Sequence, residues 1–257
     1  MDLGIAGKTA LVPGSSSGIG LAIARSLAAE GVNVVLAGRR GDLVRAEAAR
    51  LPGALGLEID LAHGSAPDDL VAAAIARLGA IDILVLNGGG PPPGAAATIG
   101  HDELLTAMHL LLLQQVRLTQ LVLDGMRQRR WGRIIAVGSS GIQQPLPALA
   151  LSNIGRAGLA GYLKTLATEM AADGVTVNMV LPGRIDTNRV GTLDHAAATR
   201  SGSSVAEARA ASEATIPARR YGQPEEFAAV VTFLAGECAS YVTGEQIRCD
   251  GGLVRSY

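Results

Sequence analysis

Short runs of aliphatic residues alternate along this chain with longer stretches in which apolar positions recur at helical spacing. The short runs are rich in β-branched residues and predict seven strands: Thr9 to Val12, Val32 to Ala37, Ala54 to Ile59, Ile83 to Asn87, Arg133 to Gly138, Val175 to Val180 and Gln246 to Cys249. Helices are expected between them. Ile19 to Glu30 forms one that stops at Gly31, and another ends at Asp173 before Gly174, both glycines serving as left-handed caps. This alternation predicts an α/β Rossmann fold, with a doubly wound sheet of seven parallel strands and helices on both faces.

The domain organisation follows from the absence of any linker-like break in this pattern. No linker, charge block or repeat of fixed period divides the 257 residues, so residues 1–257 are expected to form a single dinucleotide-binding domain. A segment from about Arg184 to Gly222 departs from the alternation, because it is rich in Ala, Ser and Gly without a strand-like run. We expect a helical excursion or substrate lid there, over the sheet edge where open α/β sheets bind ligands.

Composition and charge exclude several classes of protein. Hydrophobic residues make up 48% of the chain and charged residues 18%, which argues against disorder, and a net charge of -1 offers nothing to a nucleic acid or an anionic membrane. Cys238 and Cys249 have no metal-ligand spacing, so they are expected to be buried or idle thiols in a reducing cytoplasm, and no metal site is predicted. No signal peptide is visible, and Leu104 to Leu123, interrupted by polar residues, predicts a helix buried in protein rather than a membrane span.

A glycine-rich turn joins the first strand to the first helix. It reads Gly14-Ser15-Ser16-Ser17-Gly18-Ile19-Gly20, with the spacing G-x-x-x-G-x-G. Glycines permit positive φ and a close backbone approach, and the N-terminus of the following helix offers free N–H groups to a pyrophosphate. The turn therefore predicts a dinucleotide site; the alternative is a plain tight turn.

The end of the second strand bears on the choice of cofactor. Gly38-Arg39-Arg40 stands where an NAD-preferring Rossmann protein usually carries an acidic residue for the ribose 2′-hydroxyl. Arginine forks match the geometry of a 2′-phosphate, which favours NADP(H), with NAD(H) as the second choice. The alternative is that the two arginines only cap a strand at the solvated rim.

With these features, the chain resembles the short-chain dehydrogenase/reductase family over essentially its whole length. Gly14 to Gly20 matches the family's glycine turn, although Pro13 stands where Thr is usual, and Asn87-Gly88-Gly89 matches the Asn-Ala-Gly segment. Further matches are Asp60-Leu61, Ser139 after the fifth strand, Asn178 to Gly183 with Thr187, Gly222 to Glu226, Tyr241 to Gly244 and Asp250 to Gly252.

The resemblance implies a site and an assembly. The implied cofactor-binding residues are Gly14, Ser16, Ser17, Gly18, Ile19, Gly20, Arg39, Arg40, Asp60, Leu61, Asn87, Gly88, Gly89, Arg156, Pro182, Gly183, Ile185 and Thr187. Ser139 takes the place of the family's catalytic serine, or Ser140 if the register shifts by one. Such proteins are often homodimers or homotetramers, and within the family this chain looks most similar to the 3-oxoacyl-thioester reductases.

Three further positions depart from the family pattern, and they are the ones that matter for proton transfer. The Tyr-x-x-x-Lys pair falls, without a gap, on Ser152 and Arg156, thirteen and seventeen residues after Ser139. Their i,i+4 spacing still directs both side chains to one pocket. Tyr162 lies nearly three turns beyond Ser152 and cannot replace the missing tyrosine. The family's supporting Asn falls on Leu111.

These departures change the chemistry that is available. In ketone reduction an acid protonates the developing alkoxide, and a phenol with a pKa of about 10, lowered by a nearby ammonium, can do this. Serine is a far weaker acid, and arginine does not release a proton. Losing a positioned general acid costs on the order of 10²–10⁴ in rate. Arg156 could still bind the nicotinamide ribose or stabilise an oxyanion, and Ser139 could still donate a hydrogen bond.

Two main functions remain open, beside other chemistry in the same pocket that would use Ser139 and Arg156. The first is an NADP(H)-dependent oxidoreductase acting on a small carbonyl or alcohol substrate, for which a 3-oxoacyl thioester is one candidate. Its catalytic residues are Ser139, Ser152 and Arg156, with water, Ser152 or a substrate group as proton donor. The alternative is a dinucleotide-binding protein without turnover, acting as a sensor or inactive subunit. The predicted lid carries six arginines and four acidic residues, which suits a phosphate- or carboxylate-bearing substrate about as well as a solvated helix face.

Overall fold

A computed structural model describes residues 1–256 and shows seven parallel strands in one sheet, in the order β3-β2-β1-β4-β5-β6-β7. The strands are β1 (Thr9–Pro13), β2 (Asn33–Gly38), β3 (Leu55–Glu58), β4 (Ile83–Leu86), β5 (Gly132–Val137), β6 (Val175–Pro182) and β7 (Gln246–Cys249). The predicted strands are all present, and their ends lie within about two residues of the expected positions. The strand order reverses between β1 and β4, where doubly wound sheets form their ligand crevice.

Nine α-helices connect the strands across the described residues: α1 (Gly18–Ala29), α2 (Gly41–Ala48), α3 (Ala66–Leu78), α4 (His101–Met108), α5 (Gln114–Arg129), α6 (Ala150–Met170), α7 (Asn188–Ser201), α8 (Val205–Thr215) and α9 (Pro224–Ala235). Short 3₁₀ turns cover Ala96–Thr98, Ser140–Ile142, Ala171–Asp173 and Glu237–Ala239. The predicted caps are confirmed, since Gly31 has φ +79° and Gly174 has φ +76°. Left-handed backbone of this kind favours glycine.

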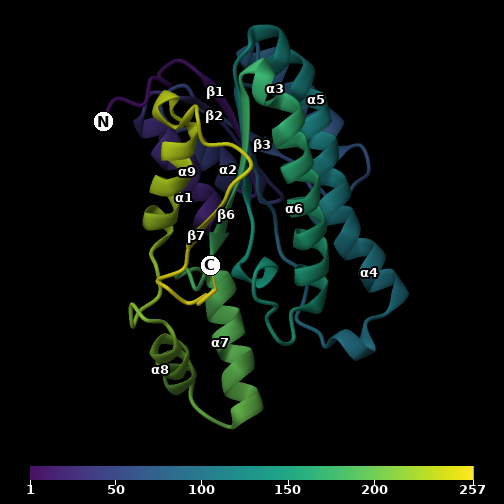
Figure 1. The fold of residues 1–257 in the computed structure, drawn as a ribbon, viewed down its shortest axis with the longest axis vertical. Helices are drawn as coiled ribbons and strands as arrows, with labels where there is room; N and C mark the ends of the chain where they lie inside the picture. Colours follow the sequence, from purple (N-terminus) through teal and green to yellow (C-terminus); the bar gives the residue numbers. More distant parts are fainter. Residues whose placement is uncertain (257) are drawn as a thin grey trace.

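Helices cover both faces of the sheet (Figure 1). Helices α1, α2 and α9 lie on one face, and α3, α5 and α6 lie on the other. The alternation of side chains along β1 explains the two layers, because Val12 packs with the first group and its neighbour Leu11 packs with the second. Both residues are fully buried. The predicted doubly wound α/β fold is confirmed.

The apolar stretch Leu104 to Leu123 differs from its prediction as one buried helix. It is continuous helix, but a π-helical segment, His109–Leu113, separates α4 from α5. Only one side is buried: Leu111 is 4% exposed, whereas Leu105 is 55% and Leu113 is 57% exposed. The prediction of one buried helix is wrong here because leucines on the outer side of these helices cannot be distinguished, from sequence alone, from leucines in the core.

The stretch from Arg184 to Gly222 forms the helical excursion that its composition predicts. Helices α7 and α8 stand beyond the end of the sheet, below the other helices in Figure 1. A β-bridge between Ile185 and Gly222 closes the base of the excursion. Buried Tyr221 donates a hydrogen bond to Asp194 of α7 at 2.9 Å and anchors the excursion.

Two smaller predictions concern thiols and membranes. Both cysteines are free, as expected of buried or idle thiols, and neither is fully buried, since Cys238 is exposed and Cys249 is half-buried. Within residues 1–256, no group of three or more His, Cys, Asp or Glu side chains is placed to hold a metal ion. Within the same range, every helix is too short or too polar to cross a membrane.

Candidate active site

The glycine-rich turn lies between β1 and α1, and its shape depends on its glycines. Gly14 has φ +65°, and Gly18 has φ +58°. A Cβ on Gly20 would lie 2.4 Å from the carbonyl oxygen of Gly14, so no larger residue fits there. From the end of β4, the Nδ2 of Asn87 donates to the carbonyl oxygens of Pro13 at 2.9 Å and Gly14 at 3.3 Å. The turn is thus fixed as a cradle at the N-terminus of α1, as a pyrophosphate requires.

An outer cavity of about 650 Å³ opens beside this turn. Arg39, Arg40, Asp60 and Leu61 line it, together with Ser16. The guanidinium of Arg40 donates to the hydroxyl of Ser16 at 2.8 Å and to that of Ser17 at 2.6 Å. Arginine and hydroxyl donors gathered at one cavity wall suit a phosphate group. The two arginines therefore face a cavity and are not placed only as strand caps.

An inner cavity of about 340 Å³ lies on the other side of the turn, at the carboxyl ends of β4, β5 and β6. The remaining predicted site residues line it: Gly18, Ile19, Gly20, Asn87, Ser139, Ser152, Arg156, Pro182, Gly183, Ile185 and Thr187. Both cavities share Gly14, Ser17, Gly88, Gly89 and Gly90. The two cavities therefore form one groove that passes over the glycine turn, and the donors along it fit NADP(H).

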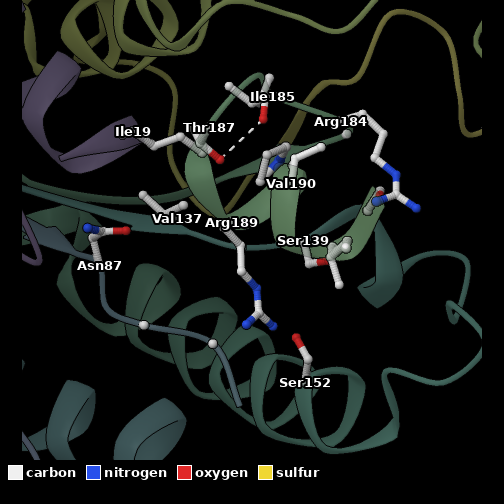
Figure 2. A pocket seen from close by; sticks show the side chains of 18 of the residues that line it. Ile19, Asn87, Val137, Ser139, Ser152, Arg184, Ile185, Thr187, Arg189 and Val190 are labelled. Atoms are coloured by element: carbon white, nitrogen blue, oxygen red, sulfur yellow. Dashed lines mark hydrogen bonds between the residues drawn. The ribbon is translucent and has the colours of Figure 1, made fainter. Parts of the chain in front are cut away.

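Ser139, Ser152 and Arg156 reach the inner cavity from two elements. Ser139 follows β5, and its Oγ accepts a hydrogen bond from the backbone N–H of Gly141 at 3.1 Å. Ser152 and Arg156 lie one turn apart on α6, as their spacing predicts. Figure 2 shows the hydroxyl of Ser152 directed into the pocket. Ser140 is buried and also lines this cavity, so the register alternative is not separated by placement alone.

Arg156 is held in place by the backbone of β5. Its Nη1 donates to the carbonyl oxygen of Val137 at 2.5 Å. Burial, and secondly the positive charge of Arg189, lower the pKa of Arg156 from 12.5 to about 10. The side chain keeps some accessible surface, and this surface opens onto the cavity. Because a pKa of about 10 is still far above neutrality, Arg156 carries its charge at pH 7.

The site contains no conventional proton donor. Among the described residues that line the inner cavity there is no Tyr, His, Lys, Cys, Asp or Glu, and its titratable side chains are Arg156, Arg184 and Arg189. Leu111 is buried under α6 and is absent from the cavity wall. What the cavity can supply is therefore hydroxyl hydrogen bonds and positive charge.

Three functional candidates were missed in the sequence. Arg184 and Arg189 were counted as lid charges, but both line the inner cavity. Gln115 lines the outer cavity, is 4% exposed, and its Oε1 accepts no hydrogen bond from residues 1–256. Helical spacing alone could have placed Gln115 on the inward side of α5, but an unsatisfied oxygen is visible only in three dimensions.

A parallel sheet in this order, with a glycine cradle at its crevice and arginines beside it, defines a dinucleotide-binding protein of the Rossmann type. A family model described as "Enoyl-(Acyl carrier protein) reductase" matches residues 14–254. The chain belongs to the short-chain dehydrogenase/reductase family. This confirms the resemblance seen in the sequence.

Relatives of known activity cover nearly the whole chain. The 3-oxoacyl-[acyl-carrier-protein] reductase FabG of Vibrio cholerae is 34% identical over 257 residues, covering 98% of this chain and 99% of that protein. Among solved structures, L-sorbose reductase from Gluconobacter frateurii, complexed with NADPH and L-sorbose, has a TM-score of 0.93 at 34% identity and full coverage of both chains. A variant of actinorhodin polyketide ketoreductase with NADPH has a TM-score of 0.92 at 34% identity, covering 97% of this chain and 98% of that one. These likenesses support the predicted oxidoreductase class.

Proposed function

We propose that this protein is an NADP(H)-dependent reductase of carbonyl compounds, and that Ser139, Ser152 and Arg156 assist the reaction without a tyrosine. One observation carries the proposal: a continuous groove leads from Arg40, over the glycine turn, to these three side chains. A groove of this form can hold a dinucleotide with its phosphates on the turn and its reactive ring beside the serines. The reductases named among the relatives support the same class.

When bound, the cofactor supplies a hydride to the carbonyl carbon of the substrate. The hydroxyl groups of Ser139 and Ser152 donate hydrogen bonds to the carbonyl oxygen, and the charge of Arg156 stabilises the negative charge that develops on it. A serine hydroxyl is a weak acid, and Arg156 keeps its proton in this scheme because its positive charge is what stabilises the alkoxide. A water molecule therefore protonates the alkoxide and leaves hydroxide to the solvent, which completes the alcohol.

The cofactor roles follow from position in the groove. Arg39 and Arg40, with Ser16, bind the 2′-phosphate, while Asp60 and Leu61 contact the adenine. The turn binds the pyrophosphate, and Asn87, Arg156, Pro182, Gly183, Ile185 and Thr187 surround the nicotinamide end. With Arg40 in the place of an acidic residue, NADPH binds more tightly than NADH.

The experiment compares binding of NADPH and NADH by fluorescence, and then follows cofactor oxidation with simple ketones and 3-oxoacyl thioesters. We expect tighter binding of NADPH and turnover of at least one carbonyl substrate. Tight NADPH binding without turnover of any substrate would favour the alternative function, a dinucleotide-binding sensor or inactive subunit. Tighter binding of NADH would refute the role given to Arg39 and Arg40.

Further proposals concern the excursion, the assembly and the location of the protein. We propose that residues 184–222 form a lid over the substrate, within a single domain of residues 1–257. We also propose a cytoplasmic homodimer or homotetramer. Exposed apolar side chains on α4, on the π-helical segment after it and on α6 support the oligomer: Leu105, Leu113 and Ile154. Light scattering coupled to size-exclusion chromatography tests it, and a monomeric mass would refute it.

A further inference from the structure

The six arginines between residues 184 and 220 fall into two groups. Arg209 pairs with Asp186 at 2.7 Å and with Glu213 at 2.9 Å, and Arg220 pairs with Glu226 at 2.6 Å. Carboxylates therefore neutralise these two charges. Arg219 and Arg200 belong with them in the first group, whose four members line neither cavity. Arg219 donates to the carbonyl oxygen of Ala214, and Arg200 is exposed at the end of α7.

Arg184 and Arg189 form the second group. Both line the inner cavity, and neither forms an ion pair with residues 1–256. Arg189 extends from the first turn of α7 toward Ser152 on α6, and Arg184 lies on another side of the same pocket (Figure 2). The excursion therefore places two arginines without an ion-pair partner among the described residues on the wall of the cavity that holds the proposed reaction site, and directs the guanidinium of Arg189 toward Ser152.

The position of Arg189 is supported by the loop after β4. Its Nη2 donates to the carbonyl oxygen of Pro91 at 2.7 Å. A Cβ on Gly90 would lie 3.1 Å from the same nitrogen, so glycine at this position leaves room for the guanidinium. One hydrogen bond uses one of the five N–H donors of an arginine, and the others remain available to a ligand.

The charges of the cavity are unbalanced. Arg156, Arg184 and Arg189 bring three positive charges to its wall, and no Asp or Glu of the described chain lines it. The lowered pKa of Arg156, caused first by burial and then by Arg189, reflects the cost of this arrangement. Arg156 and Arg184 are partly buried and Arg189 is exposed, and partly buried cations without a counter-charge are destabilising, so an anion that enters the cavity gains from their charges.

The anionic groups of the cofactor have their own hydrogen-bond donors elsewhere in the groove. Its pyrophosphate belongs at the N-terminus of α1, and its 2′-phosphate belongs beside Arg40 in the outer cavity. Arg184 and Arg189 line only the inner cavity, on the side of Ser139 and Ser152. The anion that these two arginines are placed to bind is therefore part of the substrate.

We propose that the inner cavity selects carbonyl substrates that carry an oxyanion group, a carboxylate or a phosphate monoester, bound by Arg189 together with Arg184. The proposal rests on the carbonyl reductase function proposed above and names its substrate class. Arginine forks bind both kinds of oxyanion in the same way, through paired N–H donors. Arg156, on α6, adds its positive charge, and in the proposed reaction it also faces the carbonyl oxygen of the substrate.

The test uses two pairs of probes, each an oxyanion with a neutral counterpart, and the members of the first pair have nearly the same shape. The pairs are 4-oxopentanoate with 4-oxopentanamide, and dihydroxyacetone phosphate with dihydroxyacetone. Calorimetric titrations are made with the NADP⁺-saturated protein and with the cofactor-free protein. We expect at least one anion to bind about 10-fold or more tightly than its neutral partner, since a charge-assisted hydrogen bond contributes about 1.5–3 kcal/mol and each 1.4 kcal/mol is tenfold. The pair with the larger preference distinguishes a carboxylate from a phosphate.

Variants then assign the preference to named side chains. Arg189→Gln keeps a polar side chain but removes the charge, and we expect it to abolish most of the preference without changing the dissociation constant of NADP⁺. Arg200→Gln removes the same charge from the same helix outside the cavity and should keep the preference. Equal binding of anions and neutral partners in the wild-type protein would overturn the proposal.

Two outcomes separate this proposal from the proposed function. If neutral ketones are reduced as well as anionic ones, the reductase function stands and the oxyanion selection is wrong. If NADP(H) does not bind, the reductase function is wrong, and the titration of the cofactor-free protein still decides whether the cavity selects oxyanions. Loss of NADP⁺ affinity in Arg189→Gln, with the anion preference intact, would assign Arg189 to the cofactor and overturn the proposal.

Discussion

Leu111 packs its side chain directly against the backbone of Gly155, so closely that a Cβ on Gly155 would lie 2.7 Å from the Cβ of Leu111. Leu111 belongs to the π-helical segment between α4 and α5, and Gly155 lies on α6, between Ser152 and Arg156. Hydrocarbon therefore fills the position where the family's supporting Asn is expected.

This contact predicts a loss of stability on substitution. Gly155→Ala forces a methyl group onto Leu111 and should lower the free energy of unfolding by about 1–3 kcal/mol. Gly161→Ala is the matched control on the same helix, because a Cβ there meets no atom within 4 Å, and it should stabilise by about 0.5–1 kcal/mol. Urea denaturation measures both.

A double variant tests whether Leu111 causes the effect. Leu111→Gly removes both atoms that the added methyl group of Gly155→Ala would meet, the Cβ at 2.7 Å and the Cδ1 at 2.8 Å, so the two substitutions together should cost less than the sum of the single ones. Additive losses would show that Leu111 is not the residue that Gly155 accommodates.

The contacts of Arg40 predict its contribution to cofactor choice. Arg40→Ala removes the guanidinium held by Ser16 and Ser17, and the affinity for NADPH should fall about 10- to 100-fold, from the loss of one charge-assisted interaction with phosphate. Binding of NADH, which has no 2′-phosphate, should change little. Fluorescence titration measures both, with Arg77→Ala, an exposed arginine of α3, as the control for charge. Equal losses for both cofactors would contradict the assignment.

The sheet and the cofactor groove could be predicted from sequence because each depends on local signals. Aliphatic runs such as Ile83–Leu86 mark strands, and a turn such as Gly14 to Gly20 is rare without a phosphate to bind. All predicted site residues line one of the two cavities. The assignment of the Tyr-x-x-x-Lys positions to Ser152 and Arg156, made by counting from Ser139, stays a prediction, and the structure places both residues on the unbroken helix α6.

What the sequence could not provide was the pairing of charges between distant segments. Arg189 and Arg209 look alike as members of a basic excursion, yet Arg209 is neutralised by Asp186 and Arg189 is not. Which arginine finds a carboxylate depends on how α7 and α8 pack, and this is a tertiary property. The same reason explains the π-helical segment, because Leu110 to Leu113 have no sequence pattern that separates it from an ordinary helix.

The missing proton donor leads to a prediction of gained activity. Ser152→Tyr with Arg156→Lys restores a phenol and an ammonium at i,i+4 on α6, and reduction of simple ketones should rise, by up to the order of 10²–10⁴ that a general acid contributes. Oxidation of NADPH with cyclohexanone measures it. The single variant Arg156→Lys is the control, since it changes the cation without adding an acid.

The outcome of that double variant also bears on Leu111. Unchanged activity would mean that the apolar contact with Gly155 blocks the relay or that the pocket performs other chemistry. Adding Leu111→Asn to the double variant separates these two explanations, because only the first predicts that the triple variant gains activity.

The pH dependence of reduction follows from the titratable groups of the inner cavity. Its cations include Arg156, whose pKa is lowered to about 10 by burial and by Arg189, and no described lining residue is an acid or a base that titrates near neutrality. Arg156 is protonated below its pKa, so its charge stabilises the alkoxide throughout roughly pH 6–9 and is lost only as the pH rises through about 10. The rate at saturating substrate should therefore be flat from about pH 6 to 9.

Ser152→Tyr with Arg156→Lys supplies the comparison for this profile. Its phenol, with a pKa of about 10 that the lysine lowers, must be protonated to act as the acid. The rate of the variant should therefore begin to fall at a lower pH than that of the wild-type protein, because the phenol loses its proton before an arginine does. An inflection between about pH 6 and 9 in the wild-type profile would contradict a site without a conventional acid and would require a donor from the substrate.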